Sequence, residues 1–129
     1  MNLRKGVVGG LVAVALITIT LGAAYDDNRP GTVTGYVLDS ACLFVKNIKK
    51  PLNAGKRALE CAKAGSPLAI LADDGTIYWP ISDAMPATGQ NARLMESAGQ
   101  KVAAQRKLFE RGGSHPIALE TIAVVPGGN

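Results

Sequence analysis

The sequence has few of the residues that bind metals, form disulfides or stack on bases. Its 129 residues include two cysteines, one histidine, two phenylalanines, one tryptophan and three tyrosines. No C-x-x-C or H-x-x-x-H pair occurs, so the usual spacings of zinc ligands are missing. So few aromatic side chains argue against a platform for single-stranded nucleic acid, which is therefore not an expected partner.

Recognisable catalytic patterns are also missing. The chain has no Ser-His-Asp order, no nucleophile elbow and no glycine-rich loop of the phosphate-binding type. We therefore predict a protein that is not an enzyme.

The first 24 residues have the order of a secretory signal peptide. Arg4 and Lys5 precede an uncharged stretch over 7–21, and Gly22-Ala23-Ala24 forms a cleavage site of small residues. The stretch is shorter than the roughly 20 residues that span a bilayer, although an uncleaved N-terminal anchor is the alternative. No cysteine follows it for a lipoprotein anchor. We expect an exported protein, periplasmic or extracellular, with no stable membrane span once the signal peptide is cleaved.

The remaining chain is predicted to form one small domain over 32–125, between a flexible leader at 25–31 and a tail at 126–129. A cluster of basic residues lies within 46–57, and no acidic residue interrupts it. It is either a solvated loop that keeps the protein soluble or a surface that binds an anionic lipid, a polymer or a protein. Its members are Lys46, Lys49, Lys50, Lys56 and Arg57.

Five segments have the composition or alternation of β-strands. Asp74-Gly75 marks a tight turn between two of them, and Pro80 should end the second or place it at an edge. Gly35 lies within the first strand, which suggests sharp coiling or a close approach of another backbone. The fourth segment suits a helix equally well by propensity, but pairing across the turn at 111–114 favours a strand. The predicted strands are 32–38, 68–71, 77–79, 101–110 and 115–125.

Two helices are expected between these strands. One runs over 54–63, with Asn53 as its N-cap and Gly65 at its C-terminal end, and a shorter one runs over 91–97. The predicted fold is mainly β: a five-stranded OB-fold-like barrel with a helical insert after strand 1 and a short helix between strands 3 and 4.

A set of short segments carries a family resemblance. They are VTGYVLDSAC at 33–42, CAKAGSP at 61–67, Asp73-Asp74-Gly75 with Tyr78, and GQKV at 99–102 with ERGG at 110–113. In this order and spacing the chain resembles a group of small exported bacterial OB-fold proteins of unassigned activity. The resemblance implies the fold and the compartment, but no reaction. Many members have His and Cys where this chain has Ala54 and Arg57, so no metal or haem role follows from that cluster.

The two cysteines, Cys42 and Cys61, are expected to form a disulfide. Cysteine pairs in small exported domains most often do, and a bridge closing this loop would contribute about 3 kcal/mol. The alternatives are two free thiols or a zinc or copper site with His115 and Asp39 as further ligands. A thiol redox enzyme would need an exposed cysteine of low pKa.

The resulting functional prediction is an exported binding or interaction module on a disulfide-stapled barrel. Its partner is an unidentified protein, a polyanion or a small ligand. The alternative is a periplasmic metal-binding protein that uses Cys42 and Cys61. His115 is expected to be solvated, and Trp79 beside Tyr78 is expected to be core packing with one surface aromatic.

Overall fold

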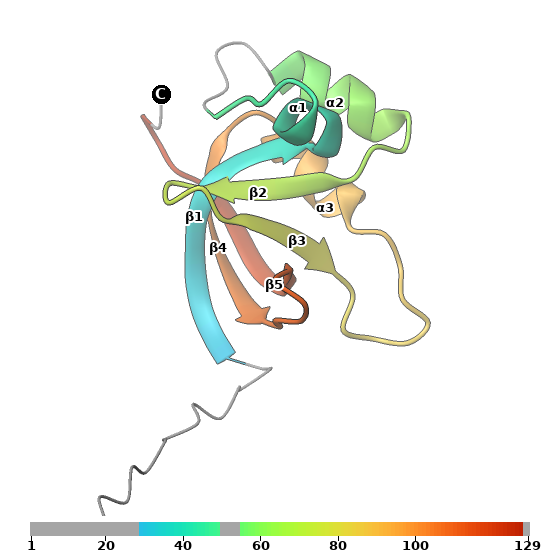
Figure 1. The fold of residues 1–129 in the computed structure, drawn as a ribbon, viewed down its shortest axis with the longest axis vertical. Helices are drawn as coiled ribbons and strands as arrows, with labels where there is room; N and C mark the ends of the chain where they lie inside the picture. The colour runs from blue at the N-terminus through green and yellow to red at the C-terminus, as the bar shows by residue number, and fades with distance from the viewer. Residues whose placement is uncertain (1–28, 50–54, 128–129) are drawn as a thin grey trace, which may run out of the picture.

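A computed structural model of the chain describes residues 29–49 and 55–127. The predicted signal peptide, Lys50 and the predicted N-cap Asn53 lie outside these residues. The elements are β1 (Arg29–Asp39), α1 (Ser40–Phe44), α2 (Gly55–Lys63), β2 (Leu68–Ala72), β3 (Ile77–Ile81), α3 (Asn91–Leu94) with a 3-10 turn (Met95–Ser97), β4 (Lys101–Leu108) and β5 (His115–Val124). Figure 1 shows their arrangement.

The five strands form a closed barrel in the order β1-β2-β3-β5-β4. β1 is antiparallel to both β2 and β4, and β3 closes the barrel by pairing in parallel with β5. A helix follows the first strand and a short helix lies between the third and fourth strands. The predicted mainly β, OB-fold-like barrel is therefore confirmed.

Alternation along the strands separates an inner face from an outer face. Val33 and Val37 of β1 point into the barrel, where they pack with Ile70, Val102 and Ile117. All five are nearly or completely buried. This inner core supplies most of the apolar burial that stabilises the domain.

Glycine is required at position 35, where β1 pairs with two neighbouring strands and the β2 backbone lies very close. Gly35 pairs with Ala72 of β2 and Val102 of β4. A Cβ at this position would collide with the Leu71 carbonyl and lie 2.9 Å from the Ala72 Cα. The close backbone approach expected from a glycine within the strand is confirmed.

The helices lie outside the strands (Figure 1). α2 buries Ala58 and Ala62 against the inner core, and Gly65 follows it with a φ of +102°. α3 places Leu94 in the same core, and its Asn91 side chain accepts a hydrogen bond from the Leu68 N–H at 2.9 Å. Among the described residues, no helix is long and apolar enough to cross a membrane.

Several boundaries differ from those predicted. β1 begins at Arg29 rather than Thr32, because residues 29–31 also pair with β4. α1 was not predicted, since a five-residue helix is too short to show helical periodicity. Pro80 does not end β3 but pairs with Ile117 in β5 where β2 no longer flanks the strand, which agrees with the predicted alternative of a position at an edge. That position spares Pro80 the hydrogen bond that it cannot donate.

Candidate functional site

A second apolar cluster lies on the outside of the barrel. Leu38, Ala69 and Leu71 point outward from β1 and β2, and Leu43 of α1 packs on them. We call these four buried residues the outer cluster. Its partly buried neighbours are Tyr36, Ile48, Ile77 and Trp79. The barrel therefore has an apolar outer face that is only partly covered by α1 and the segment after it.

Asp39 positions α1 over this face. Its fully buried carboxylate accepts hydrogen bonds from the backbone N–H groups of Ala41 at 3.0 Å and Cys42 at 3.3 Å. This is an N-cap, in which a side chain satisfies helix donors that have no partner within the helix. Asn47 then adopts a φ of 50°, and the Ile48 N–H donates to the Cys42 carbonyl at 3.0 Å. The chain thereby turns back and brings Ile48 onto the outer cluster.

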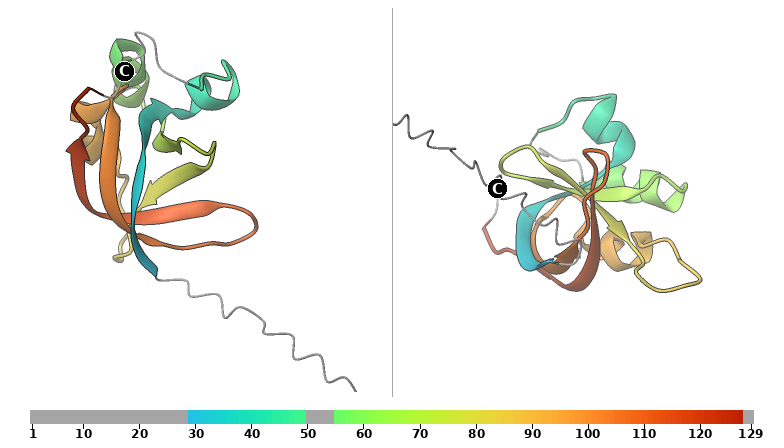
Figure 2. Two further views of the ribbon diagram at one scale, coloured as in Figure 1. Left: turned by 90° about the vertical axis from the view of Figure 1, so that its left-hand side faces the viewer. Right: turned by 60° about the horizontal axis from the view of Figure 1, so that its bottom comes forward.

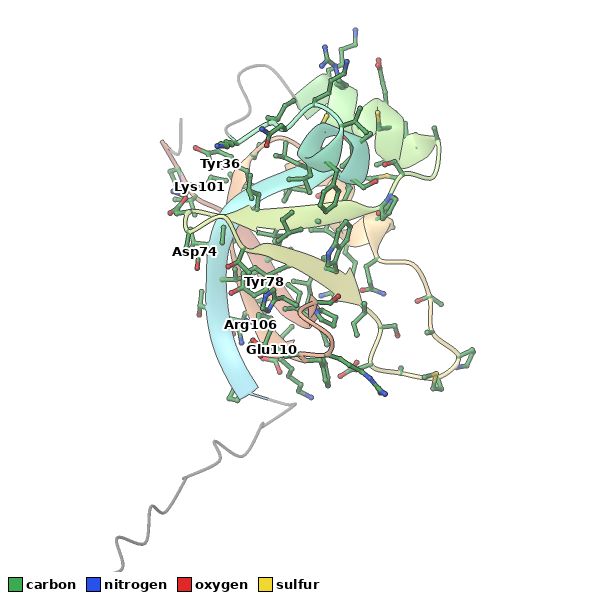
Figure 3. All side chains as sticks on the ribbon, in the orientation of Figure 1. Tyr36, Asp74, Tyr78, Lys101, Arg106 and Glu110 are labelled. Carbon is green, nitrogen blue, oxygen red and sulfur yellow. The ribbon has the colours of Figure 1, made fainter. Side chains whose placement is uncertain are left out.

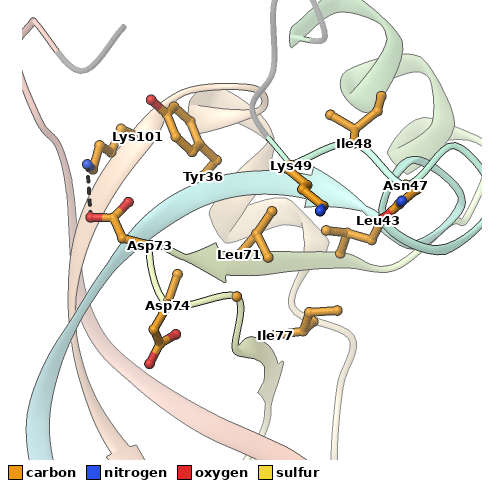
Figure 4. Close-up of a pocket in the computed structure, with 12 residues that line it drawn as sticks. Tyr36, Leu43, Asn47, Ile48, Lys49, Leu71, Asp73, Asp74, Ile77 and Lys101 are labelled. Carbon is orange, nitrogen blue, oxygen red and sulfur yellow. Dashed lines mark hydrogen bonds and ion pairs between the residues drawn. The ribbon is translucent and has the colours of Figure 1, made fainter.

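A pocket of about 630 Å³ opens beside the outer cluster (Figure 4). Its apolar side includes Leu43, Ile48 and Leu71, and its polar side includes Asp73 and Lys101. The lining comes from β1, the segment after α1, the β2–β3 hairpin and the start of β4. The volume lies within the range of about 300–1,000 Å³ that is usual for small-molecule sites.

Lys101, Asp73 and Asp74 at this pocket have partners within the protein, and the exposed Lys49 lines it as well. The Lys101 ammonium lies 3.1 Å from the Asp73 carboxylate and 5.7 Å from the centre of the Tyr36 ring. Asp74 accepts a hydrogen bond from the Thr76 N–H at 2.9 Å, which lowers the pKa of that carboxyl. The pocket therefore combines an apolar floor with a rim of nearly balanced charge.

A second pocket of about 380 Å³ adjoins the first, because both are lined by Gly75 and Ile77. The rings of Phe44 and Trp79 line it, nearly parallel and with their centres 6.0 Å apart. His115, the first residue of β5 after the β4–β5 turn, lines it as well. We call the two joined pockets the outer groove. The left view of Figure 2 shows α1, the β2–β3 hairpin and the β4–β5 turn projecting on one side of the barrel.

His115 also belongs to a polar cluster near the β4–β5 turn. Its Nδ1 lies 3.3 Å from the Glu110 carboxylate, and its ring centre lies 5.9 Å from that of Tyr78. The Arg106 guanidinium lies over the Tyr78 ring, 5.8 Å from the ring centre. Figure 3 shows Tyr78, Arg106 and Glu110 together, away from Tyr36 and Lys101. The His115 side chain is therefore 35% exposed, so it is partly solvated, and it lies against Glu110.

The predicted disulfide is not formed, because Cys42 and Cys61 are both free thiols. The prediction of a barrel cross-linked by this bond is therefore wrong. Cys42 lies on α1 and Cys61 on α2, so a bond between them depends on how the two helices are placed and not on their spacing in the sequence. Burial raises the pKa of the Cys42 thiol to about 11, and the neighbouring Asp39 carboxylate adds to this rise. This shift is opposite to the one that a thiol redox enzyme needs.

The metal ligands considered from the sequence do not assemble either. His115 pairs with Glu110 beside β3 and β5, whereas Asp39 and Cys42 lie where β1 meets α1. Within residues 29–49 and 55–127, no three His, Cys, Asp or Glu side chains form a group that could hold a metal ion. Among the described residues, the structure therefore contains no site for the zinc or copper of the alternative prediction.

The predicted basic loop is divided between two elements. Lys46 and Lys49 follow α1, whereas Lys56 and Arg57 lie on α2, and all four side chains are exposed. Lys49 also lines the larger pocket. Lys50 lies outside the described residues.

Several groove residues carried no prediction of a site. Tyr36, Phe44, Asp73 and Lys101 come from four separate elements or turns, and although three of them fall in the segments that carry the family resemblance, that resemblance gave none of them a role. Strand alternation could have placed Tyr36 and Trp79 on one outer face. Only the barrel's closure brings Lys101 beside them, through the pairing of Tyr36 with Lys101.

Comparison with protein-family models gives no match, and neither do comparisons with curated proteins and with solved structures. The functional assignment therefore depends on the geometry and chemistry of the outer groove.

Proposed function

We propose that this protein is an exported binding module that holds a ligand in the outer groove. The observation that carries the proposal is the pair of adjoining pockets on the outside of β1, β2 and β3, between α1 and the β4–β5 turn. Barrels of this strand order use this face and the flanking loops to bind oligonucleotides and oligosaccharides. Export is supported by the basic, apolar and small-residue order of the first 24 residues.

The shape of the groove supports a small or narrow ligand rather than a broad polyanion. Concave sites with an apolar floor and a few polar groups are typical of small-molecule binding. A polyanion site would need unopposed positive charge, but Asp73 and Asp74 face the same pocket as Lys49 and Lys101. The exposed Lys56 and Arg57 on α2 line neither pocket.

The proposal can be tested by titrating a fragment library into isotopically labelled protein and following backbone amide shifts by NMR. We expect shifts to concentrate at groove residues such as Tyr36, Ile77 and Trp79. Ile77→Trp places a bulky ring where the two pockets meet and should abolish these shifts. Val124→Trp is the matched control, because Val124 is an exposed strand residue outside the groove. Shifts scattered over the surface, or unchanged in Ile77→Trp, would contradict the proposal.

A further inference from the structure

We infer that the ligand of the outer groove is a neutral oligosaccharide. This inference rests on the proposed function and specifies its ligand class. It depends on three features of the groove: its charge balance, the closure of the barrel beneath it, and the spacing of its aromatic rings and polar groups.

Charge balance favours an uncharged ligand. Among the residues that the structure describes, the larger pocket is lined by two lysines and two aspartates, Lys49 and Lys101 against Asp73 and Asp74. Lys101 and Asp73 already neutralise each other at 3.1 Å. Among the described residues that line the smaller pocket, His115 is the one ionisable group, and it lies against Glu110. A strongly charged ligand would meet like charge as often as opposite charge, whereas hydroxyl groups hydrogen-bond to both carboxylates and ammonium groups.

Closure of the barrel disfavours an extended peptide. Peptides that bind to sheets usually add a strand and gain affinity from main-chain hydrogen bonds at a free edge. Here β1 and β2 pair with each other beneath the larger pocket, and the barrel is closed. Recognition in this pocket therefore cannot use a free strand edge and depends on side chains and on loop residues such as Gly75, an arrangement that suits a sugar.

The arrangement of aromatic and polar groups suits a chain of sugar rings. A pyranose ring has an apolar face of C–H groups, which packs on aromatic side chains, and hydroxyl groups around its edge. Tyr36 lines one pocket, and Phe44 and Trp79 line the next, with Ile77 shared between them. Asn47 and Asp73 supply hydrogen-bonding groups at the rim of the first pocket, and Ser114 does so at the second. Successive rings of one oligosaccharide would occupy the two pockets in turn.

Isothermal titration calorimetry with three neutral probes, cellohexaose, maltohexaose and chitohexaose, tests this inference on the exported protein. We expect at least one of them to bind at a single site. Phe44→Ala should weaken binding by about 5- to 10-fold, because an aromatic contact contributes about 1 kcal/mol. Phe44 is 62% exposed, so its removal should leave the fold intact. Val45→Ala is the control, since Val45 is 77% exposed and lines neither pocket.

Asp73→Asn and the salt dependence of binding provide further readouts. A neutral ligand should bind with the same affinity, within about twofold, across the range of roughly 0.05 to 0.5 M NaCl that screens charged ligands. Asp73→Asn should weaken binding, because it removes a charged acceptor of hydroxyl hydrogen bonds.

Three results would overturn the inference: no binding by any of the three probes, tighter binding of hexagalacturonate, or preferential binding of a hexapeptide or a hexanucleotide. If fragments still shift the groove residues while the sugars do not bind, the ligand class is wrong and the binding groove stands. If Ile77→Trp also leaves the fragment shifts unchanged, both proposals fail.

Discussion

At the scale of single residues, burial determines the chemistry of the two thiols. Cys42 is 2% exposed beside the Asp39 carboxylate, whereas Cys61 is half-buried on α2. Both the low-dielectric surroundings and the nearby negative charge disfavour a thiolate at Cys42. The two cysteines should therefore differ in reactivity, although they have the same unperturbed chemistry.

Alkylation of the native protein at pH 8, without reductant, should modify Cys61 first and Cys42 much more slowly. The physical reason is that only the thiolate attacks, and Cys42 with a pKa near 11 holds very little of it. Intact-mass spectrometry of Cys42→Ser identifies the fast site, and both thiols should react in denaturant. A mass two daltons low with no alkylation until reduction would instead establish the disulfide.

The same thiol predicts a loss of stability at alkaline pH. The unfolded thiol titrates near 9.0 and the folded one near 11. The stabilising contribution is therefore complete below pH 9 and is lost as the pH rises from 9 to 11. Urea unfolding at pH 8.5 and 10.5 should show a larger fall in the free energy of unfolding for the wild-type protein than for Cys42→Ala. Equal falls in the two proteins would contradict the raised pKa.

Gly35→Ala should destabilise the protein by about 3 kcal/mol or more, because its Cβ would collide with the backbone of β2. Gly89→Ala is the matched control: no atom lies within 4 Å of the added Cβ, and its effect should remain within about 1 kcal/mol. Urea unfolding midpoints measure both. A neutral Gly35→Ala would mean that β1 and β2 do not approach each other this closely.

At the scale of secondary structure, tertiary contacts decide whether a short element forms. α1 has five residues, too few to be stable alone, and it is held by the Asp39 cap and by Leu43 in the outer cluster. In β4, tertiary contacts decide between two structures, because its sequence suits a helix as well as a strand by propensity. It forms a strand since β1 and β5 pair with it on both sides.

Leu43→Ala should destabilise α1 and the pocket beside it by about 2–4 kcal/mol, the usual cost of truncating a buried leucine. Hydrogen exchange should show faster exchange of the backbone amides at 43–48, while the inner barrel strands change less. Val45→Ala, on the neighbouring exposed side chain, should alter stability by no more than about 0.5 kcal/mol. Unchanged exchange in Leu43→Ala would show that the outer cluster does not hold α1.

At the scale of the whole molecule, the predicted export sets the compartment in which the groove would meet a ligand. Protein recovered after export should begin at Tyr25, because cleavage is expected after Ala24. Intact-mass spectrometry of the exported and the cell-associated fractions measures this. A full-length chain retained with the membrane would favour the uncleaved anchor instead.

Local patterns in the sequence were enough to predict the order of the strands along the chain, the two-sided alternation within β1 and the turn at Asp74-Gly75. These features depend on side chains a few residues apart, so local propensity and periodicity describe them. Which outward-facing residues meet depends on the pairing of strands that are distant along the chain. The groove joins Tyr36, Ile77 and Lys101, which are brought together because β1 pairs with both β2 and β4, and β2 pairs with β3. Likewise, the spacing of Cys42 and Cys61 allowed a disulfide, but both are free thiols in the folded protein, because the bond depends on how α1 and α2 are placed, which spacing along the chain does not determine.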